Sequence, residues 1–101
     1  MDQIRIPESV LKYTAFVRSR IQGITRILLF GSYAKGTFGE NSDIDLAIVF
    51  DRLSDSFDMQ VQLMKLRRKF DTRIEPHPIR EADLDPSNPF VREVFKTGLE
   101  I

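Results

Sequence analysis

Two apolar runs lie close together in the chain, and they constrain its fold more than any other feature. The first run, residues 24–30, is followed by Gly31-Ser32. Ten residues separate Ser32 from Asp43, where Asp43 and Asp45 open a second apolar run over residues 43–50. Continuously apolar runs of this length predict strands that are buried on both faces. The connection allows the two strands to pair antiparallel, which places the end of the first beside the start of the second. We therefore expect Gly31-Ser32 and both aspartates to meet at one edge of a sheet.

The size, charge and composition of the chain limit the kinds of protein that it can be. It has 101 residues, which predicts a single domain over residues 1–101. Lys plus Arg and Asp plus Glu number 15 each, so no net charge attracts nucleic acid, and a nucleic-acid partner is not expected. The absence of cysteine excludes thiolate metal sites and favours a reducing cytoplasmic location. No apolar run approaches the ~20 residues that span a bilayer, so we expect no membrane association.

The remaining sequence predicts three helices and one further strand. A helix of about 14 residues begins at Pro7-Glu8-Ser9, because its apolar residues recur at helical spacing. A second helix, capped by Ser54 or Ser56, precedes a strand over residues 71–75. Pro76 and Pro78 cannot donate to a ladder, so this strand either ends there or lies at a sheet edge. The last helix begins at Asn88-Pro89 and ends at Gly98, before a short apolar tail.

These elements give the order α-β-β-α-β-α and an α/β (α+β) fold class. The strand–helix–strand unit over residues 43–75 should be a right-handed crossover with parallel strands. The expected architecture is a small mixed three-stranded sheet flanked by helices.

The second helix carries two features of different character. Phe57, Val61 and Met64 belong to an apolar stripe that predicts packing on the sheet. Basic residues crowd its last turns, at Lys65, Arg67, Arg68 and Lys69. A solvated face that complements the helix dipole is the simplest interpretation of the basic cluster, and substrate binding is the alternative.

The Asp-x-Asp pair predicts a cation site. On a strand, Asp43 and Asp45 project to the same face roughly 7 Å apart, and such close carboxylates repel each other unless a cation lies between them. Oxygen ligands suit Mg²⁺ above all. The pair alone could equally be surface acids on an edge strand, but the neighbouring residues are apolar on both faces, which makes unpaired acids costly.

The Gly31-Ser32 turn predicts an anion site. Backbone N–H groups at the start of a helical turn attract phosphate, Gly31 permits close approach, and Ser32 adds a hydroxyl donor. Lys35 could reach the same phosphates. An ordinary strand-to-helix turn would show the same two residues. The turn indicates a functional site only because an anion site and a hard-metal site are expected to meet at one edge of the sheet. Together they suit a nucleoside triphosphate with Mg²⁺.

These residues carry a family resemblance. The segments Leu29-Phe30-Gly31-Ser32-Tyr33-Ala34-Lys35-Gly36 and Ser42-Asp43-Ile44-Asp45-Leu46 resemble the nucleotidyltransferase fold of DNA polymerase β type. In length and element order the chain is similar to the minimal nucleotidyltransferases (MNT), small prokaryotic proteins often encoded beside a helical HEPN-domain protein.

The resemblance implies roles for the candidate residues. Gly31, Ser32 and Lys35 would contact the triphosphate, and Asp43 and Asp45 would bind metal, with two Mg²⁺ ions expected. A third catalytic and metal-binding carboxylate belongs on the strand after the crossover. Glu75 fits the apolar-acid-apolar pattern better than Asp71, although the family often has Asp there and Pro76 is not a typical strand residue, so both residues stay open.

Three other side chains near these motifs have alternative interpretations. The single histidine, His77, lies between two prolines and is expected to be structural or solvent-facing, with a role as base or ligand as the minor alternative. Tyr33 and Phe38 flank the loop and could stack on a nucleobase or simply cover the sheet edge.

The resemblance also implies an activity and a partner. The expected reaction is transfer of AMP from ATP to a hydroxyl, on a tyrosine of a partner HEPN toxin, with this chain as the antitoxin. Larger relatives append a helical domain that grips the acceptor; this chain has none, so the partner should supply that surface. A catalytically inactive antitoxin that acts by binding, or nucleotidyl transfer to RNA or a small molecule, are the alternatives. The acceptor, the base preference and any homo-oligomer are not specified by the sequence.

Overall fold

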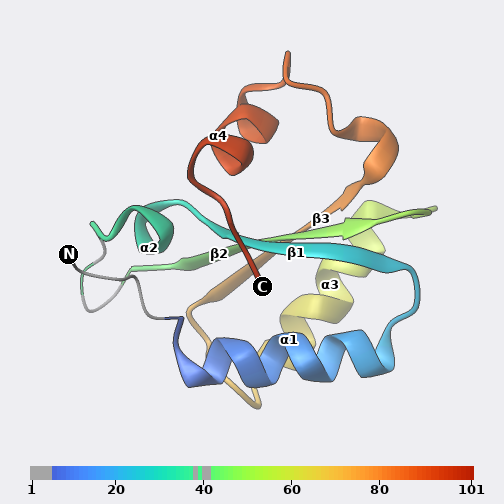
Figure 1. Cartoon of the computed structure of the whole chain (residues 1–101). Coiled ribbons are helices and arrows are strands. Elements are labelled where there is room, and N and C mark those ends of the chain that lie inside the picture. Colours follow the sequence, from blue (N-terminus) through green and yellow to red (C-terminus); the bar gives the residue numbers. More distant parts are fainter. Residues whose placement is uncertain (1–5, 38, 40–41) are drawn as a thin grey trace.

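The computed structural model describes residues 6–37, 39 and 42–101, and these residues form three layers (Figure 1). One helix, α4 (Pro89–Thr97), covers one face of a mixed sheet, and α1 (Glu8–Arg20) and α3 (Ser56–Arg67) cover the other. Within the described part of the chain, no helix is long and apolar enough to cross a membrane.

The central pair of strands forms as the two apolar runs predict. β1 (Ile24–Phe30) and β2 (Ile44–Phe50) pair antiparallel, with Phe30 opposite Asp45. Side chains alternate between the two faces of each strand. Leu28 and Ala47 therefore belong to the core under α4, and Leu29 and Leu46 to the larger core against α1 and α3. The site is thus built on the two most deeply buried strands of the fold.

The third strand is longer than predicted. β3 comprises Ile74–Arg80 and runs parallel to β2, so the strand passes through both prolines and does not end at residue 75. The prolines are tolerated because β3 is the outer strand of the sheet. The backbone nitrogens of both prolines face away from β2, so the ladder between β2 and β3 loses no hydrogen bond. Side chains of α3 occupy two outward carbonyl groups of this edge: Gln60 Nε2 donates to Pro76 O at 3.3 Å and Arg67 Nη1 to Ile74 O at 2.8 Å.

The predicted three-stranded sheet is wrong by one strand. The apolar tail pairs with β1 as β4 (Leu99–Glu100), which gives the strand order β3-β2-β1-β4. The Ile101 N–H also donates to Ile27 O at 2.9 Å. Two residues are too short to show a strand pattern, so the tail was recognisable only as apolar.

The helices begin and end close to their predicted limits, with two corrections. Asp55, not Ser54 or Ser56, caps α3, and its carboxylate accepts from the Asp58 N–H at 3.0 Å. The apolar stripe of α3 is only partly buried: Leu63 is inaccessible, whereas the side chain of Phe57 is 76% exposed. α4 begins after Asn88 as predicted, and Asn88 Oδ1 accepts from the Phe90 N–H.

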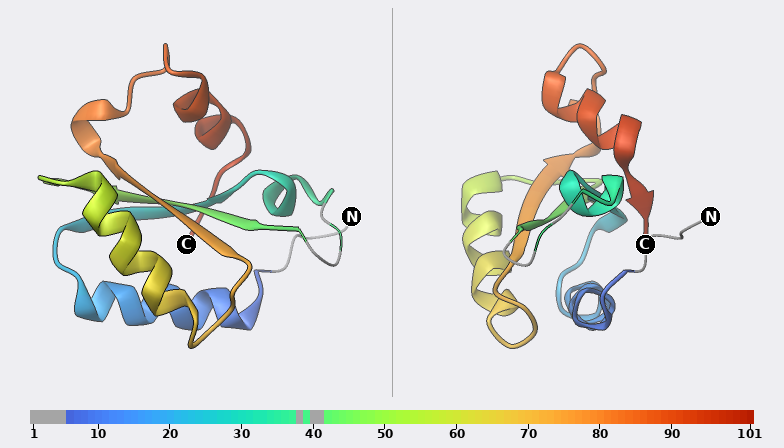
Figure 2. Two further views of the ribbon diagram at one scale, coloured as in Figure 1. Left: turned by 180° about the vertical axis from the view of Figure 1, so that it is seen from behind. Right: turned by 90° about the vertical axis from the view of Figure 1, so that its left-hand side faces the viewer.

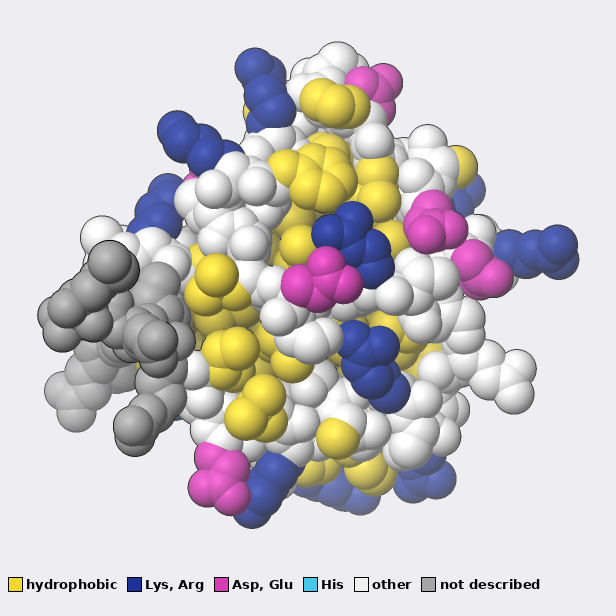
Figure 3. Space-filling model, viewed as in Figure 1, with side chains coloured by type: hydrophobic (Ala, Val, Ile, Leu, Met, Phe, Trp, Pro, Cys, Tyr) yellow, Lys and Arg dark blue, Asp and Glu magenta, His cyan; other side chains and the backbone are white. Residues whose placement is uncertain are grey.

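Figure 3 shows the face that carries β4, with hydrophobic side chains between α4 and α1 and with Lys and Arg side chains of the described residues at several separate positions.

Candidate functional site

The end of β1 meets the start of β2 as predicted, and the contact is tight. Gly31 follows Phe30 with φ +77°, a conformation that L side chains rarely adopt. A Cβ at this position would lie 2.6 Å from Asp45 Oδ2. Position 31 therefore accommodates only glycine, and the turn and the second aspartate form one surface.

Ser32 begins a short helical turn immediately after this contact. α2 (Ser32–Lys35) ends at Gly36, which adopts a left-handed conformation. The Gly31 N–H donates to Thr97 Oγ1 of α4 at 3.4 Å, and Gly31 O accepts from the Lys35 N–H. The end of α4 thus holds the turn from above, while β2 supports it from the side.

The acids lie at the same edge with different exposure. Asp43 precedes β2 and is exposed, whereas the Asp45 side chain is half-buried at 28% exposure. Glu75 is the register partner of Asp45 in the parallel β2–β3 pair, so both side chains belong to the face that α4 covers. Glu75 Oε1 lies 3.9 Å from Arg67 Nη1, which reaches it around the edge of β3.

Asp71, the alternative third carboxylate, is engaged elsewhere. Its oxygens accept from the Arg73 guanidinium at 2.8 and 3.0 Å, from the Arg73 N–H at 3.0 Å, and from Ser9 Oγ at 2.8 Å. The hydrogen bonds from Arg73 are the largest cause that lowers the pKa of Asp71 to about 2. This carboxylate ties the start of α1 to the turn before β3, so Glu75 is the acid that faces Asp45.

His77 belongs to the site, which the sequence indicates only as the minor alternative. Its Nε2 lies 3.2 Å from Asp45 Oδ1, and its ring packs between Phe30 and Phe90 at centroid distances of 5.4 Å. The expectation of a structural or solvent-facing histidine misses this contact with a candidate metal ligand. His77 shares the strand parity of Glu75, so a strand continued through the prolines would have revealed it.

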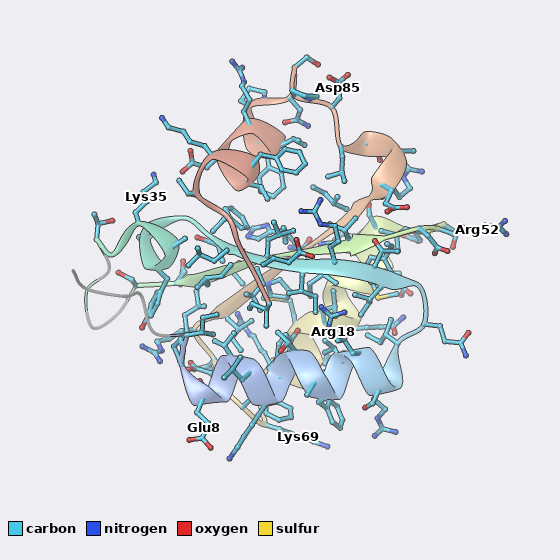
Figure 4. All side chains as sticks on the ribbon, viewed as in Figure 1. Glu8, Arg18, Lys35, Arg52, Lys69 and Asp85 are labelled. Atoms are coloured by element: carbon cyan, nitrogen blue, oxygen red, sulfur yellow. The ribbon has the colours of Figure 1, made fainter. Side chains whose placement is uncertain are left out.

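Two residues of α2, Lys35 and Tyr33, contact side chains of other elements, and Phe38 lies outside the described residues. Lys35 Nζ pairs with Glu93 Oε1 of α4 at 2.8 Å, and Figure 4 shows Lys35 directed toward that helix. Tyr33 is buried, and its hydroxyl accepts from Arg73 Nη1 at 2.8 Å. Tyr33 therefore covers the sheet edge, in agreement with the simpler of its two interpretations.

Comparison with protein families decides the class of the fold. The family model described as a nucleotidyltransferase domain matches residues 11–97. The chain belongs to this nucleotidyltransferase family. The match includes every candidate residue named above and nearly all of the sheet.

One curated relative matches part of the chain. A Methanocaldococcus jannaschii protein named "putative protein adenylyltransferase" is 42% identical over 45 residues. The match covers 44% of this chain and 45% of that protein, so the chain spans less than half the length of this relative.

Solved structures share the fold at low identity. A mutant of the toxin–antitoxin pair MntA–HpeT has a TM-score of 0.67 at 23% identity, over 96% of this chain and 72% of its own. A nucleotidyltransferase candidate from Sulfolobus solfataricus has a TM-score of 0.64 at 21% identity, over 92% and 76%. A tri-AMPylated Shewanella oneidensis HEPN toxin in complex with MNT antitoxin gives 0.54 at 17%, over 91% and 70%. These similarities establish the nucleotidyltransferase fold.

The donor set of this nucleotidyltransferase domain suits Mg²⁺ in part. Asp43 and Asp45 offer carboxylate oxygens at one edge, and Mg²⁺ usually takes only one or two protein carboxylates together with phosphate and water. Among residues 6–37, 39 and 42–101, no three His, Cys, Asp or Glu side chains converge closely enough to hold a metal ion.

Proposed function

We propose that this domain transfers AMP from ATP, with Mg²⁺, to a hydroxyl of a partner polypeptide. The contact between Gly31 and Asp45 carries the proposal, because it joins a phosphate-binding turn to a carboxylate that ligates hard cations. Family membership and the partial relative named as an adenylyltransferase support the reaction class. The toxin–antitoxin neighbours support a tyrosine of a HEPN toxin as the acceptor, with this domain as the antitoxin.

The residues of β1 and α2 bind the donor in this proposal. Gly31 and Ser32 hold the triphosphate, and Lys35 joins them only when its ion pair with Glu93 opens. Asp43 and Asp45 would hold the ions, which would neutralise the phosphates and stabilise the leaving pyrophosphate. Glu75, as the third carboxylate, faces Asp45 from the next strand.

The transfer step is an in-line displacement. The acceptor oxygen forms a bond to the α-phosphorus, and the bond between that phosphorus and the oxygen bridging to the β-phosphorus breaks. The proton of the hydroxyl passes to a Glu75 carboxylate oxygen, and pyrophosphate leaves. The protein contributes mainly orientation and charge neutralisation.

Label transfer tests the proposal directly. The protein is incubated with Mg²⁺, ATP labelled on the α-phosphate, and the purified product of the adjacent gene. We expect label on that polypeptide, lost in the double variant Asp43→Asn/Asp45→Asn. Neutralisation of the toxin that survives the double variant without label would show an antitoxin that acts by binding, and label on RNA or a small molecule would identify a different acceptor.

A further inference from the structure

α3 and β3 lie side by side (Figure 2). An open groove follows the outer side of α3 and turns around the edge of β3. Its first part is a hollow of about 490 Å³ between the start of α3, β3 and α4, whose walls include His77 and Phe90. Its second part, of about 380 Å³, continues along α3. Both parts are lined by Phe57 and Gln60, so they are one surface, which we call the α3 groove.

The α3 groove touches the candidate site at two points. His77 lines the first part, and the same side chain lies 3.2 Å from Asp45. Arg67 lines the second part, and its guanidinium lies 3.9 Å from Glu75. A molecule in the groove is therefore one side chain away from both Asp45 and Glu75.

The chemistry of the α3 groove changes along its length. Phe57 is 76% exposed and Val61 37% exposed, although both belong to the stripe predicted to pack on the sheet. Lys65, Arg67 and Arg68 line the far part of the same surface. An exposed aromatic side chain beside a cationic margin is typical of a protein-binding surface.

The direction of the reaction places the acceptor on this side. The strand order puts β1, which ends in the triphosphate turn, on one side of β2 and β3 on the other. In an in-line displacement the attacking hydroxyl enters opposite the leaving pyrophosphate, which is held at Gly31-Ser32. The hydroxyl therefore approaches over Glu75 and His77, where the α3 groove opens.

We propose that the α3 groove docks the acceptor as a polypeptide segment, with an apolar or aromatic side chain against Phe57 and His77 and carboxylates over Lys65 and Arg68. This inference rests on the proposed nucleotidyl transfer and adds the place and chemistry of the acceptor. The apolar walls and one-sided positive charge of the α3 groove fit an acidic peptide better than an RNA backbone, which requires a continuous basic track.

Equilibrium binding separates docking from catalysis. The dissociation constant of the purified product of the adjacent gene is measured by calorimetry for wild type, Phe57→Ala and Arg68→Glu, all exposed positions. Phe95→Ala and Arg92→Glu are the matched controls, because both lie exposed on α4, and Arg92 is about 200° around that helix from Phe90. We expect each groove variant to weaken binding at least about 10-fold, as interface anchors do, and each control to change it less than about 2-fold.

The same variants are then assayed for label transfer, with the KM for ATP as a second readout. We expect the KM for the acceptor to rise with the dissociation constant and the KM for ATP to stay at the wild-type value. Equal binding by groove variants and controls, no measurable binding by wild type, or label on an RNA oligonucleotide in place of protein overturns the docking proposal. Tight, groove-dependent binding without any label supports docking and overturns the proposed transfer, so the two failures are distinguishable.

Discussion

Two carboxylates at the beginning of β3 have opposite environments. Asp71 accepts hydrogen bonds from Ser9 and from both the side chain and the backbone of Arg73, and its side chain is only 11% exposed. Glu75, four residues later, has one cation at 3.9 Å and a side chain that is 34% exposed. The sequence placed both acids on the same strand face and left either available as the third carboxylate.

The difference shows how a structural acid and a candidate functional acid can be told apart. A carboxylate whose oxygens are saturated by fixed donors stabilises the fold and has little capacity left for a ligand. A partly exposed carboxylate beside a second one keeps its lone pairs for a cation or a proton. In this protein Asp71 belongs to the first kind, and Asp45 and Glu75 to the second.

The largest expected effect is the difference in label transfer between a variant of Asp45 and a variant of Asp71. Asp45→Asn removes a charge from the proposed ion site, so we expect label transfer to fall by about 10³-fold, the scale of losing a principal electrostatic contact. Asp71→Asn should change the rate of label transfer by less than about 3-fold, because the Asp71 side chain contacts neither the Gly31-Ser32 turn nor the candidate acids of the site. The measurement is the rate of label transfer at saturating ATP, on samples whose circular dichroism spectra match. A comparable loss of rate in both variants would show that Asp45 and Asp71 do not differ in function.

A second test uses two glycines that both have a positive φ. Gly31 has φ +77° and ψ −152°, whereas Gly36 has φ +76° and ψ 13°, and a Cβ at Gly36 would meet nothing within 4 Å. Gly31→Ala should lower transfer by about 10²-fold, because displacing Asp45 by a fraction of an ångström misaligns the site. Gly36→Ala places a side chain in the left-handed helical region without a clash, so its conformational cost is smaller and it should retain activity. Equal losses of activity in the two variants would mean that the contact between position 31 and Asp45 does not control transfer.

The third test concerns stability and pH. The pKa of Asp71 is about 2 in the folded protein and 3.8 in the unfolded chain. Between these two pH values the unfolded chain therefore binds more protons than the folded protein. The stabilisation, about 2 kcal/mol, is therefore complete above about pH 4 and is lost as the pH falls toward 2. Urea unfolding across this range should show a steeper loss for wild type than for Asp71→Asn. If the free energy of unfolding falls equally with pH in both proteins, Asp71 does not provide this pH-dependent stabilisation.

The smallest effect tests one donor of the saturated carboxylate. Ser9→Ala removes the hydrogen bond that links α1 to Asp71 at 2.8 Å. We expect the free energy of unfolding to fall by about 1 kcal/mol at neutral pH, and the acid-sensitive range to move slightly upward. Ser19→Ala is a suitable control, because Ser19 bonds only within its own exposed helix turn. If the Ser9 variant is as stable as this control, the hydrogen bond from Ser9 to Asp71 does not stabilise the fold.

The sequence predicts the centre of this fold better than its margins. The long apolar runs of β1 and β2 define strand, burial and pairing at once, because each is continuous and each is bounded by a turn. Pro76 and Pro78 indicate a strand end unless the strand is known to be the outer one, which only the assembled sheet reveals. The two residues of β4 acquire their structure from β1 and not from their own pattern.

The same distinction applies to the candidate site. Gly31-Ser32 directly follows the first predicted strand, and Asp43 and Asp45 open the second, so antiparallel pairing of the two strands predicts their proximity. The contact between His77 and Asp45 depends on the register of β3 beyond Pro76, where local sequence argues against a strand. The exposure of Phe57 likewise depends on which part of α3 faces the sheet, and the apolar spacing alone placed that residue inside.

The proline edge of β3 has a consequence for solubility. An exposed outer strand normally offers a row of free N–H and C=O groups to any other unpaired strand in a crowded cell, which is how edge-to-edge aggregation begins. Here alternate positions have no N–H to give, and Gln60 and Arg67 already occupy two of the carbonyls. Concentrated protein should therefore resist sheet-to-sheet assembly on this side, and variants that restore N–H groups at Pro76 and Pro78 should aggregate more readily.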